Sequence, residues 1–253
     1  MKFYTSIVSY YDEVFPYQAP QKAFVESFNV HDYNAALLDV GCGTGSLVLN
    51  LADRFGTLIG IDPDKEMLHL AQLKALKFKA DHRDSLEELG HWVFKQGGML
   101  DISNEFASQT FSTVLCLGNT LVHLSSPEEV RSFLEGAFEI LRPGGLLMIQ
   151  IINYDRIINQ ELKGLPTIEN EKVRFERVYH YDSSPGFISF QTKLTIKESG
   201  EEIENEIPLL GLRPNQLKTL MLESGFSGLE EFGNFKKDAF GPDSQPYILV
   251  GRK

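Results

Sequence analysis

The residues with the clearest chemical potential are three closely spaced glycines and the acids on either side of them. Gly41, Gly43 and Gly45 lie in LLDVGCGTGSL, between an apolar run and a segment with helical spacing. A turn that a ligand approaches closely needs glycine, because side chains would block the backbone. Asp62 follows the loop at about the 20-residue interval expected for a carboxylate that binds ribose hydroxyls. The glycines by themselves could simply form a turn between a strand and a helix. Together with Asp39 before them and Asp62 after them, they favour a ribose-containing ligand.

The spacing of these glycines differs from the pattern that binds a dinucleotide pyrophosphate. That pattern is G-x-G-x-x-G. This loop has G-x-G-x-G, and position 46 is serine. The difference disfavours a nicotinamide-dependent oxidoreductase.

The segments around the loop alternate between strand and helix patterns, which predicts a parallel sheet with right-handed crossovers. Short apolar runs predict strands at 35–41, 57–61, 92–97, 111–117 and 146–152. Apolar residues at helical spacing predict helices at 45–54, 64–79, 127–141 and 214–224. Two further strands are expected at 226–232 and 245–252, and a short extra helix within 80–92.

The pattern changes after residue 153. Residues 172–181 and 186–198 resemble antiparallel strands joined by a turn of small and polar residues at 182–186, and 201–210 is a third candidate strand. We expect residues 154–208 to form an antiparallel β insertion that covers the substrate site, because the segment leaves from the carboxyl edge of the sheet. Residues 1–153 and 209–253 would form the Rossmann-like domain. An oligomer interface is the alternative role for the insertion.

The bulk composition narrows the classes of partner. The formal net charge is -11 at pH 7, and Lys and Arg are scattered, which disfavours DNA and RNA. No apolar run approaches the roughly 18 residues of a membrane helix, and the N-terminus lacks the features of a signal peptide. Cys42 and Cys116 make no disulfide framework, and the histidines and cysteines show no zinc spacing. We therefore expect a cytoplasmic protein without a membrane, nucleic-acid or metal partner.

Several motifs resemble one family. LLDVGCGTG is similar to the signature of class I S-adenosylmethionine-dependent methyltransferases, and GIDPDKEML to their ribose-binding motif. LRPGGLLMI and SGFSGLEEFGNF resemble the stretch before their fifth strand and their C-terminal strand region. The resemblance implies an α/β fold with a Rossmann-like parallel sheet, one antiparallel edge strand and helices on both faces, to which the small antiparallel insertion is added. It implies S-adenosylmethionine as the cofactor.

The resemblance also implies roles in binding that cofactor. The glycine loop would lie under its methionine portion, and Asp39 would fix the amino group of that portion through the loop. Asp62 would bind the ribose, and Met67 would lie near the adenine. Gly98 stands where the family commonly has an acid for the adenine amino group, which leaves backbone contacts from the next two residues. The expected set is Tyr11, Asp39, Gly41, Cys42, Gly43, Gly45, Asp62, Pro63, Met67, Gly98, Met99, Leu100, Leu117 and Gly118.

A narrower resemblance, to glycine and sarcosine N-methyltransferases, concerns the substrate side. It rests on LGNTLVHL at 117–124, NYD at 153–155 and YYDEVFPY near the N-terminus. It implies that Asn119 faces the substrate, and we take Asn119 and His123 as the candidates for a catalytic role. Ile152 stands where those relatives have an arginine that grips the substrate carboxylate, which weakens an assignment to glycine itself.

These candidates also have structural alternatives. Asn119 could cap the following helical turn, and His123 could be a hydrogen-bonded structural residue. Tyr11 could be a core aromatic or could lie over the cofactor. On one strand of the insertion, four polar or charged residues are expected to form a solvated face. Alternatively, one of them could bind an anionic part of the substrate. The four are Arg174, Arg177, Tyr179 and His180.

The expected function is methyl transfer from S-adenosylmethionine to a small molecule, with an amine nitrogen preferred. An amine that loses its proton before binding requires no strong general base, and the sequence contains no obvious catalytic dyad. The alternatives are O-methylation of a small carboxylate or hydroxyl compound, and a non-catalytic S-adenosylmethionine-binding protein. The sequence leaves the acceptor and the oligomeric state open, and a homodimer is compatible with it.

Overall fold

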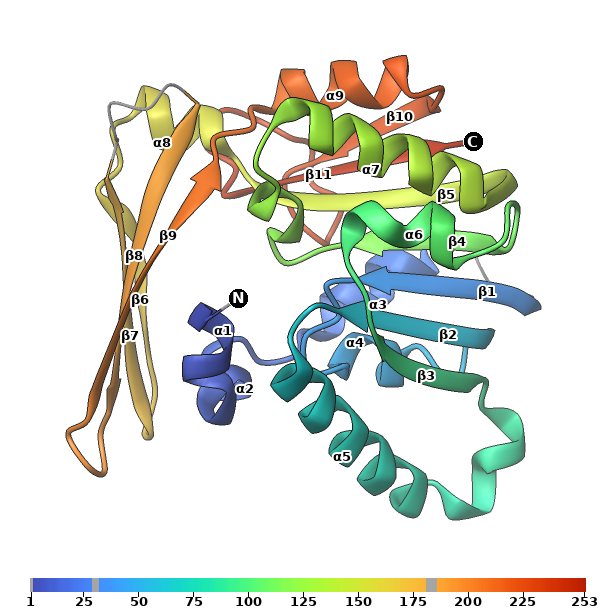
Figure 1. Ribbon diagram of the computed structural model, residues 1–253, viewed down its shortest axis with the longest axis horizontal. Coiled ribbons are helices and arrows are strands. Elements are labelled where there is room, and N and C mark those ends of the chain that lie inside the picture. The colour runs from blue at the N-terminus through green and yellow to red at the C-terminus, as the bar shows by residue number, and fades with distance from the viewer. Residues whose placement is uncertain (1, 29–31, 181–185) are drawn as a thin grey trace.

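A mixed sheet of seven strands forms the centre of the fold (Figure 1). The computed structural model describes residues 2–28, 32–180 and 186–253. The strands are β1 (Asp32–Val40), β2 (Phe55–Asp62), β3 (His91–Gln96), β4 (Phe111–Cys116), β5 (Leu141–Ile152), β10 (Ser227–Phe232) and β11 (Pro246–Arg252). Their order is β10-β11-β5-β4-β1-β2-β3, and β1 to β5 pair in parallel. β11 pairs antiparallel with both β5 and β10, so the antiparallel pairing lies at one edge, as predicted.

Helices cover both faces of this sheet, because each buries one apolar stripe against it. They are α3 (Ala19–Glu26), α4 (Ser46–Asn50), α5 (Lys65–Asp81), α6 (Ile102–Glu105), α7 (Pro127–Ile140) and α9 (Pro214–Glu223). On one face Phe24, Leu49 and Leu68 bring α3, α4 and α5 into the core. On the other face Phe133 and Leu217 do so for α7 and α9. No helix in the described residues is long and apolar enough to cross a membrane.

The predicted strands and long helices are confirmed, and the differences lie in short elements. α4 is shorter than the helix predicted over 45–54, because residues 51–54 form turns. The region 80–92 contains the last turn of α5, the 3-10 helix η2 (Arg83–Glu88) and the beginning of β3. Two more 3-10 helices, η3 (Met99–Asp101) and η4 (Thr120–His123), follow β3 and β4.

The insertion forms a second, antiparallel sheet of four strands in the order β6-β7-β8-β9. The strands are β6 (Gly164–Glu169), β7 (Val173–His180), β8 (Phe187–Ile196) and β9 (Glu202–Leu210). The predicted antiparallel sheet is therefore confirmed. β6 and the preceding helix α8 (Tyr154–Asn159) were not predicted. Of the turn expected at 182–186, residues 182–185 lie outside the described residues.

The N-terminal helices lie between the two sheets (Figure 1). They are α1 (Lys2–Ile7), η1 (Val8–Tyr10) and α2 (Tyr11–Val14), and none was predicted. Ile7 and Val14 pack with Val173 and Phe175 from the inner face of the insertion. Because these helices are short, their positions depend on such tertiary contacts.

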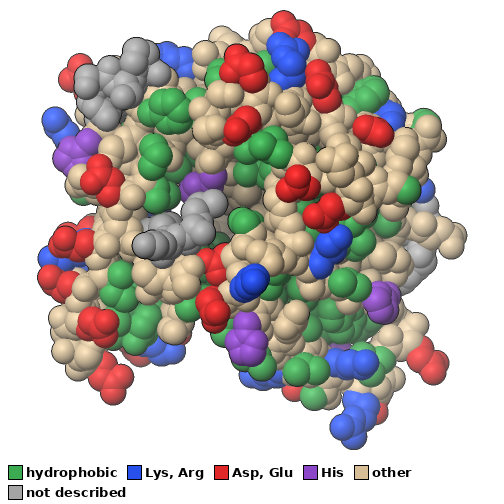
Figure 2. Space-filling model, in the orientation of Figure 1, with side chains coloured by type: hydrophobic (Ala, Val, Ile, Leu, Met, Phe, Trp, Pro, Cys, Tyr) green, Lys and Arg blue, Asp and Glu red, His purple; other side chains and the backbone are tan. Residues whose placement is uncertain are grey.

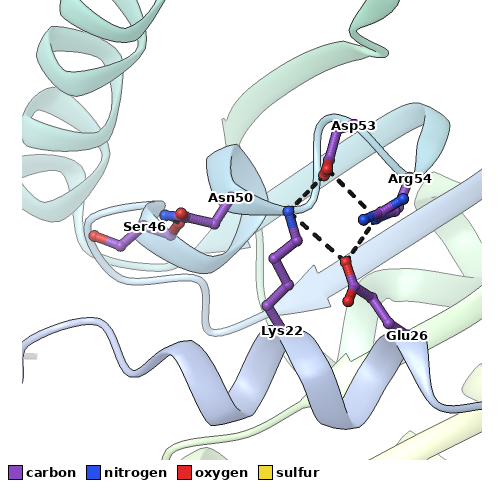
Figure 3. Close-up of polar contacts among 6 residues, drawn as sticks. All are labelled: Lys22, Glu26, Ser46, Asn50, Asp53 and Arg54. Atoms are coloured by element: carbon purple, nitrogen blue, oxygen red, sulfur yellow. Dashed lines mark hydrogen bonds and ion pairs between the residues drawn. The ribbon is translucent and has the colours of Figure 1, made fainter.

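Ion pairs fix α3 against the turn after α4 (Figure 3). Lys22 Nζ lies 2.7 Å from a carboxylate oxygen of Asp53, and Arg54 Nε lies 2.6 Å from one of Glu26. The crossed pairs, Lys22 with Glu26 and Arg54 with Asp53, are 3.7 and 3.4 Å apart. The network holds α3 against the segment that follows α4.

Candidate cofactor and substrate site

Two adjoining cavities lie beyond the carboxyl ends of β1 and β4, where an open α/β sheet binds ligands. The larger has a volume of about 670 Å³ and the smaller about 100 Å³. Figure 2 shows the surface hollowed between the insertion at the left and the main domain at the right. Six residues line both cavities, and we call them the junction: Tyr4, Tyr11, Gly41, Leu117, Gly118 and His123.

The glycine loop presents backbone rather than side chains to the junction. The φ angles of Gly41, Gly43 and Gly45 are +78°, +52° and +74°, in the left-handed region that favours glycine. The N–H groups of Gly41 and Cys42 donate to the carbonyl oxygen of Ile61 at 2.8 and 3.0 Å. The loop is therefore held to β2, and Gly41 and Gly43 line the cavities without a side chain of their own.

Asp62 ends β2 beside this loop and supports it. Its Oδ2 accepts a hydrogen bond from the N–H of Gly43 at 3.0 Å, and its Oδ1 accepts one from the N–H of Asp64 at 2.9 Å. A carboxylate has about four lone-pair sites, so both oxygens can also accept from ribose hydroxyls. Asp64 has a different role as the N-cap of α5, where it accepts from the N–H groups of Glu66 and Met67.

Most of the expected cofactor residues line one or both cavities. They are Tyr11, Asp39, Gly41, Cys42, Gly43, Asp62, Pro63, Met67, Met99, Leu117 and Gly118. The structure does not bring Gly45, Gly98 or Leu100 to the walls. Gly45 packs under a ring instead, because a Cβ there would lie 2.4 Å from Phe94 Cζ. Leu100 is 41% exposed, and Gly97 rather than Gly98 lines the smaller cavity.

Asp39 is a buried carboxyl group at the wall of the larger cavity. Burial, and next the negative charge of Asp62, raise the pKa of Asp39 to about 7. A cationic group bound beside it would lower that pKa again. The proposed contact with the amino group of the cofactor would therefore favour the ionised form.

This pKa predicts how cofactor affinity depends on pH. Binding an ammonium group lowers the pKa of Asp39, so a proton is released on binding below about pH 7. We expect the affinity for S-adenosylhomocysteine, measured by calorimetry, to fall by up to about tenfold per pH unit below pH 7 and to level off above it. Asp39→Asn should bind more weakly and lose most of this slope. An equal slope in the variant and the unaltered protein would contradict the assignment.

Asn119 joins the loop after β4 to the end of β5. Its Oδ1 accepts from the N–H of Ile152 at 2.9 Å, and its Nδ2 donates to the hydroxyl of Tyr154 at 3.2 Å. Its φ angle is +66°, and its side chain makes no cap hydrogen bond to η4. The capping alternative is therefore wrong. Asn119 also lines the larger cavity, so the proposed contact with substrate stays a prediction.

His123 lies at the junction and pairs with Tyr4. The Tyr4 hydroxyl and His123 Nε2 form a hydrogen bond of 2.9 Å. Burial lowers the pKa of His123 to about 4, and burial raises the pKa values of Tyr4 and Tyr11. All three titratable side chains of the junction are therefore uncharged at neutral pH. His123 is a weak base there, and its catalytic role stays a prediction.

The insertion forms one wall of the larger cavity. The wall is mostly apolar, and its members are Leu165, Ile168, Arg177, Phe190 and Leu209. The prediction of a solvated face was wrong for Arg177 and Tyr179, because alternate residues of a strand face opposite sides. Arg174 and His180 are exposed, whereas Tyr179 is buried and Arg177 half-buried on the inner side. On the exposed side, Arg174 Nη2 lies 3.1 Å from Oε1 of Glu176.

Three site residues were missed in the sequence. Gln150 is the polar residue in the apolar run LLMIQII, and its Oε1 accepts from the N–H of Gly118 at 2.8 Å. A single polar residue in an apolar strand indicates a specific contact, and this was the signal that could have identified Gln150. Asp12 accepts from Thr44 Oγ1 at 2.7 Å and fixes α2 to the glycine loop. Asp12 lies in the motif YYDEVFPY, but no local pattern shows its bond to Thr44, and Tyr4 had no signal at all, because both contacts join segments far apart in the chain.

Comparison with known proteins agrees with this geometry. A family model described as "Methyltransferase domain" matches residues 37–145, which contain the glycine loop, Asp62, Asn119 and His123. A glycine/sarcosine N-methyltransferase from Aphanothece halophytica is 24% identical over 258 residues, which cover 100% of this chain and 90% of the relative.

Two solved structures show that the fold is shared. An S-adenosylmethionine-dependent methyltransferase from Clostridium acetobutylicum superposes with a TM-score of 0.76 at 15% identity, covering 99% of this chain and 98% of the other. A sugar N-methyltransferase from Streptoalloteichus superposes with a TM-score of 0.64 at 19% identity, covering 93% and 88%. The coverage includes the insertion as well as the main sheet.

Proposed function

We propose that this chain, a class I S-adenosylmethionine-dependent methyltransferase, methylates an amine nitrogen of a small molecule. The observation that carries the proposal is the weak basicity of the junction: burial lowers the pKa of His123 to about 4, and the other titratable side chains there are the phenols of Tyr4 and Tyr11. An amine can lose its proton before it binds, so it needs no base at the junction. A hydroxyl acceptor would need one at neutral pH. The names of the relatives from Aphanothece halophytica and Streptoalloteichus also refer to nitrogen.

The residues around the two cavities have distinct roles in this proposal. S-adenosylmethionine, when bound, supplies a methyl group on a cationic sulfur. The glycine loop and Asp39 would hold its methionine portion, and Asp62 its ribose. Gly118 and Leu117 would contact the reacting end, and the larger cavity would hold the acceptor.

The junction would favour transfer by orientation and by exclusion of water. Holding nucleophile and methyl group in line can contribute up to about 7–11 kcal/mol when alignment is ideal. Positive charge on sulfur disappears during the reaction, so a dry site favours it. Tyr4, Tyr11 and His123 are half-buried and line the place where the two cavities meet, so they would limit the access of water to it.

Turnover with labelled cofactor tests the proposal. The purified chain would be incubated with methyl-labelled S-adenosylmethionine and a panel of small amines, hydroxyl compounds and carboxylates. We expect label on nitrogen, identified by mass spectrometry of the product. Label on oxygen would replace the proposal with O-methylation. Binding of S-adenosylhomocysteine without any turnover across the panel would support the non-catalytic alternative.

A further inference from the structure

Arg177 places a cation in an otherwise apolar wall of the larger cavity. It lies on the inner face of β7, with Leu165 directly opposite on β6. Phe190 and Leu209 line the same wall. Arg177 lines the larger cavity but not the smaller one, so it is not one of the junction residues at the proposed point of methyl transfer.

The charge of Arg177 is not compensated by a carboxylate within the described part of the chain. Its Nη2 donates to the carbonyl oxygen of Pro166. Its Nε is buried and has no hydrogen-bond partner among the described residues. Burial lowers the pKa of this guanidinium, although it stays charged at neutral pH. A half-buried cation without a counter-ion is unfavourable, and an anionic ligand would relieve that cost.

Thr192 supplies a second unpaired polar group beside it. Thr192 on β8 is directly opposite Arg177 in the register of the two strands. Side chains paired in this way have Cβ atoms about 4.5–5.5 Å apart and lie on the same face. Thr192 is 4% exposed, and its Oγ1 is also without a hydrogen-bond partner in the described residues. Two groups that can donate hydrogen bonds, and that have no partner in the described residues, therefore lie side by side on the inner face of the insertion.

We infer that Arg177, with Thr192 beside it, binds a carboxylate of the methyl acceptor. A guanidinium matches the two oxygens of a carboxylate in geometry and charge, and the threonine hydroxyl can donate to one of them. The acceptor would then be an amino carboxylate, with its amine at the junction and its carboxylate at the insertion. The inference rests on the proposed function for the position of the amine alone.

Paired ligands separate the carboxylate from the rest of the acceptor. The probes are 4-aminobutyrate and 6-aminohexanoate, each compared with its carboxamide, and binding is measured by calorimetry on the S-adenosylhomocysteine-loaded protein. We expect at least one carboxylate to bind about 10- to 100-fold more tightly than its amide. If neither does, the inference is wrong.

Three variants identify the residue responsible. Arg177→Met should remove the preference for the carboxylate, and Arg177→Lys should retain only part of it, because lysine keeps the charge but not the planar fork. Arg174→Met is the matched control from the exposed side of the same strand and should retain the full preference. S-adenosylhomocysteine affinity should be the same in all three, which also shows that each has folded.

A second cation at the larger cavity, Lys236, provides the alternative site for the carboxylate. Lys236 also lines the larger cavity, from the loop before β11. If Lys236→Met removes the preference and Arg177→Met does not, the carboxylate site is at Lys236 and the inference is overturned. Tight carboxylate binding that depends on Arg177, with no methyl transfer to any amine, would support the inference while refuting the proposed function.

Discussion

Replacing Asp62 with alanine should weaken the binding of S-adenosylhomocysteine by about 30- to 150-fold, or about 2–3 kcal/mol. The carboxylate has two tasks, which the variant loses together. It accepts the N–H groups of Gly43 and Asp64, and it is the proposed partner of the ribose hydroxyls. Calorimetry on the purified chain gives the affinity directly. Asp62→Asn keeps one acceptor oxygen, so its affinity should lie between those of the unaltered protein and Asp62→Ala.

Asp64→Ala is the matched control, because the two acids are two positions apart and both line the smaller cavity. Asp64 caps α5, so its loss should lower the free energy of unfolding by about 1 kcal/mol. It should change cofactor affinity only a few-fold. Thermal unfolding and calorimetry on both variants separate stability from binding. Equal losses of affinity would refute the role given to Asp62.

The cofactor side was predictable because its signals are local. The glycines, Asp39 and Asp62 lie on consecutive elements, and strand–loop–helix connectivity places their ends together at one edge of the sheet. The predicted parallel sheet followed from the same alternation. The short α4 was overestimated because apolar spacing alone does not show where a helix ends.

The substrate side was less predictable because its contacts join distant segments. Tyr4 and His123 are 119 positions apart, and α1 and α2 are positioned by contacts with the insertion. The inward position of Arg177 could have been predicted from the alternation of side chains along a strand. Arg177 lies two and four positions after the apolar Phe175 and Val173, so all three face the same side of the sheet. Arg174 occupies an alternate position on the strand and is exposed on the other side. No local pattern shows that Asn119 bonds to the end of β5.

Gly41→Ala should damage both stability and cofactor binding, because strain and a steric clash act together at this position. Alanine in the left-handed region costs about 1–2 kcal/mol. The added Cβ would also lie 2.3 Å from Thr120 Cγ2, so the loop or Thr120 must move. We expect the free energy of unfolding to fall by about 2–4 kcal/mol in total. Movement of the loop would break its bonds to Ile61 and should weaken S-adenosylhomocysteine binding by about 100-fold.

Gly200→Ala separates backbone strain from the steric contact at Gly41. Gly200 has a φ angle of +73°, close to the +78° of Gly41, but a Cβ there would meet nothing within 4 Å. It lies in the turn between β8 and β9, so its variant should lose only the roughly 1–2 kcal/mol of strain and bind the cofactor normally. Thr120→Ser, added to Gly41→Ala, removes the Cγ2 contact and should recover part of both losses. Denaturant unfolding gives the free energy of unfolding, and calorimetry gives the affinity for S-adenosylhomocysteine. Equal losses in Gly41→Ala and Gly200→Ala would show that the contact with Thr120 has no part in shaping the cofactor loop.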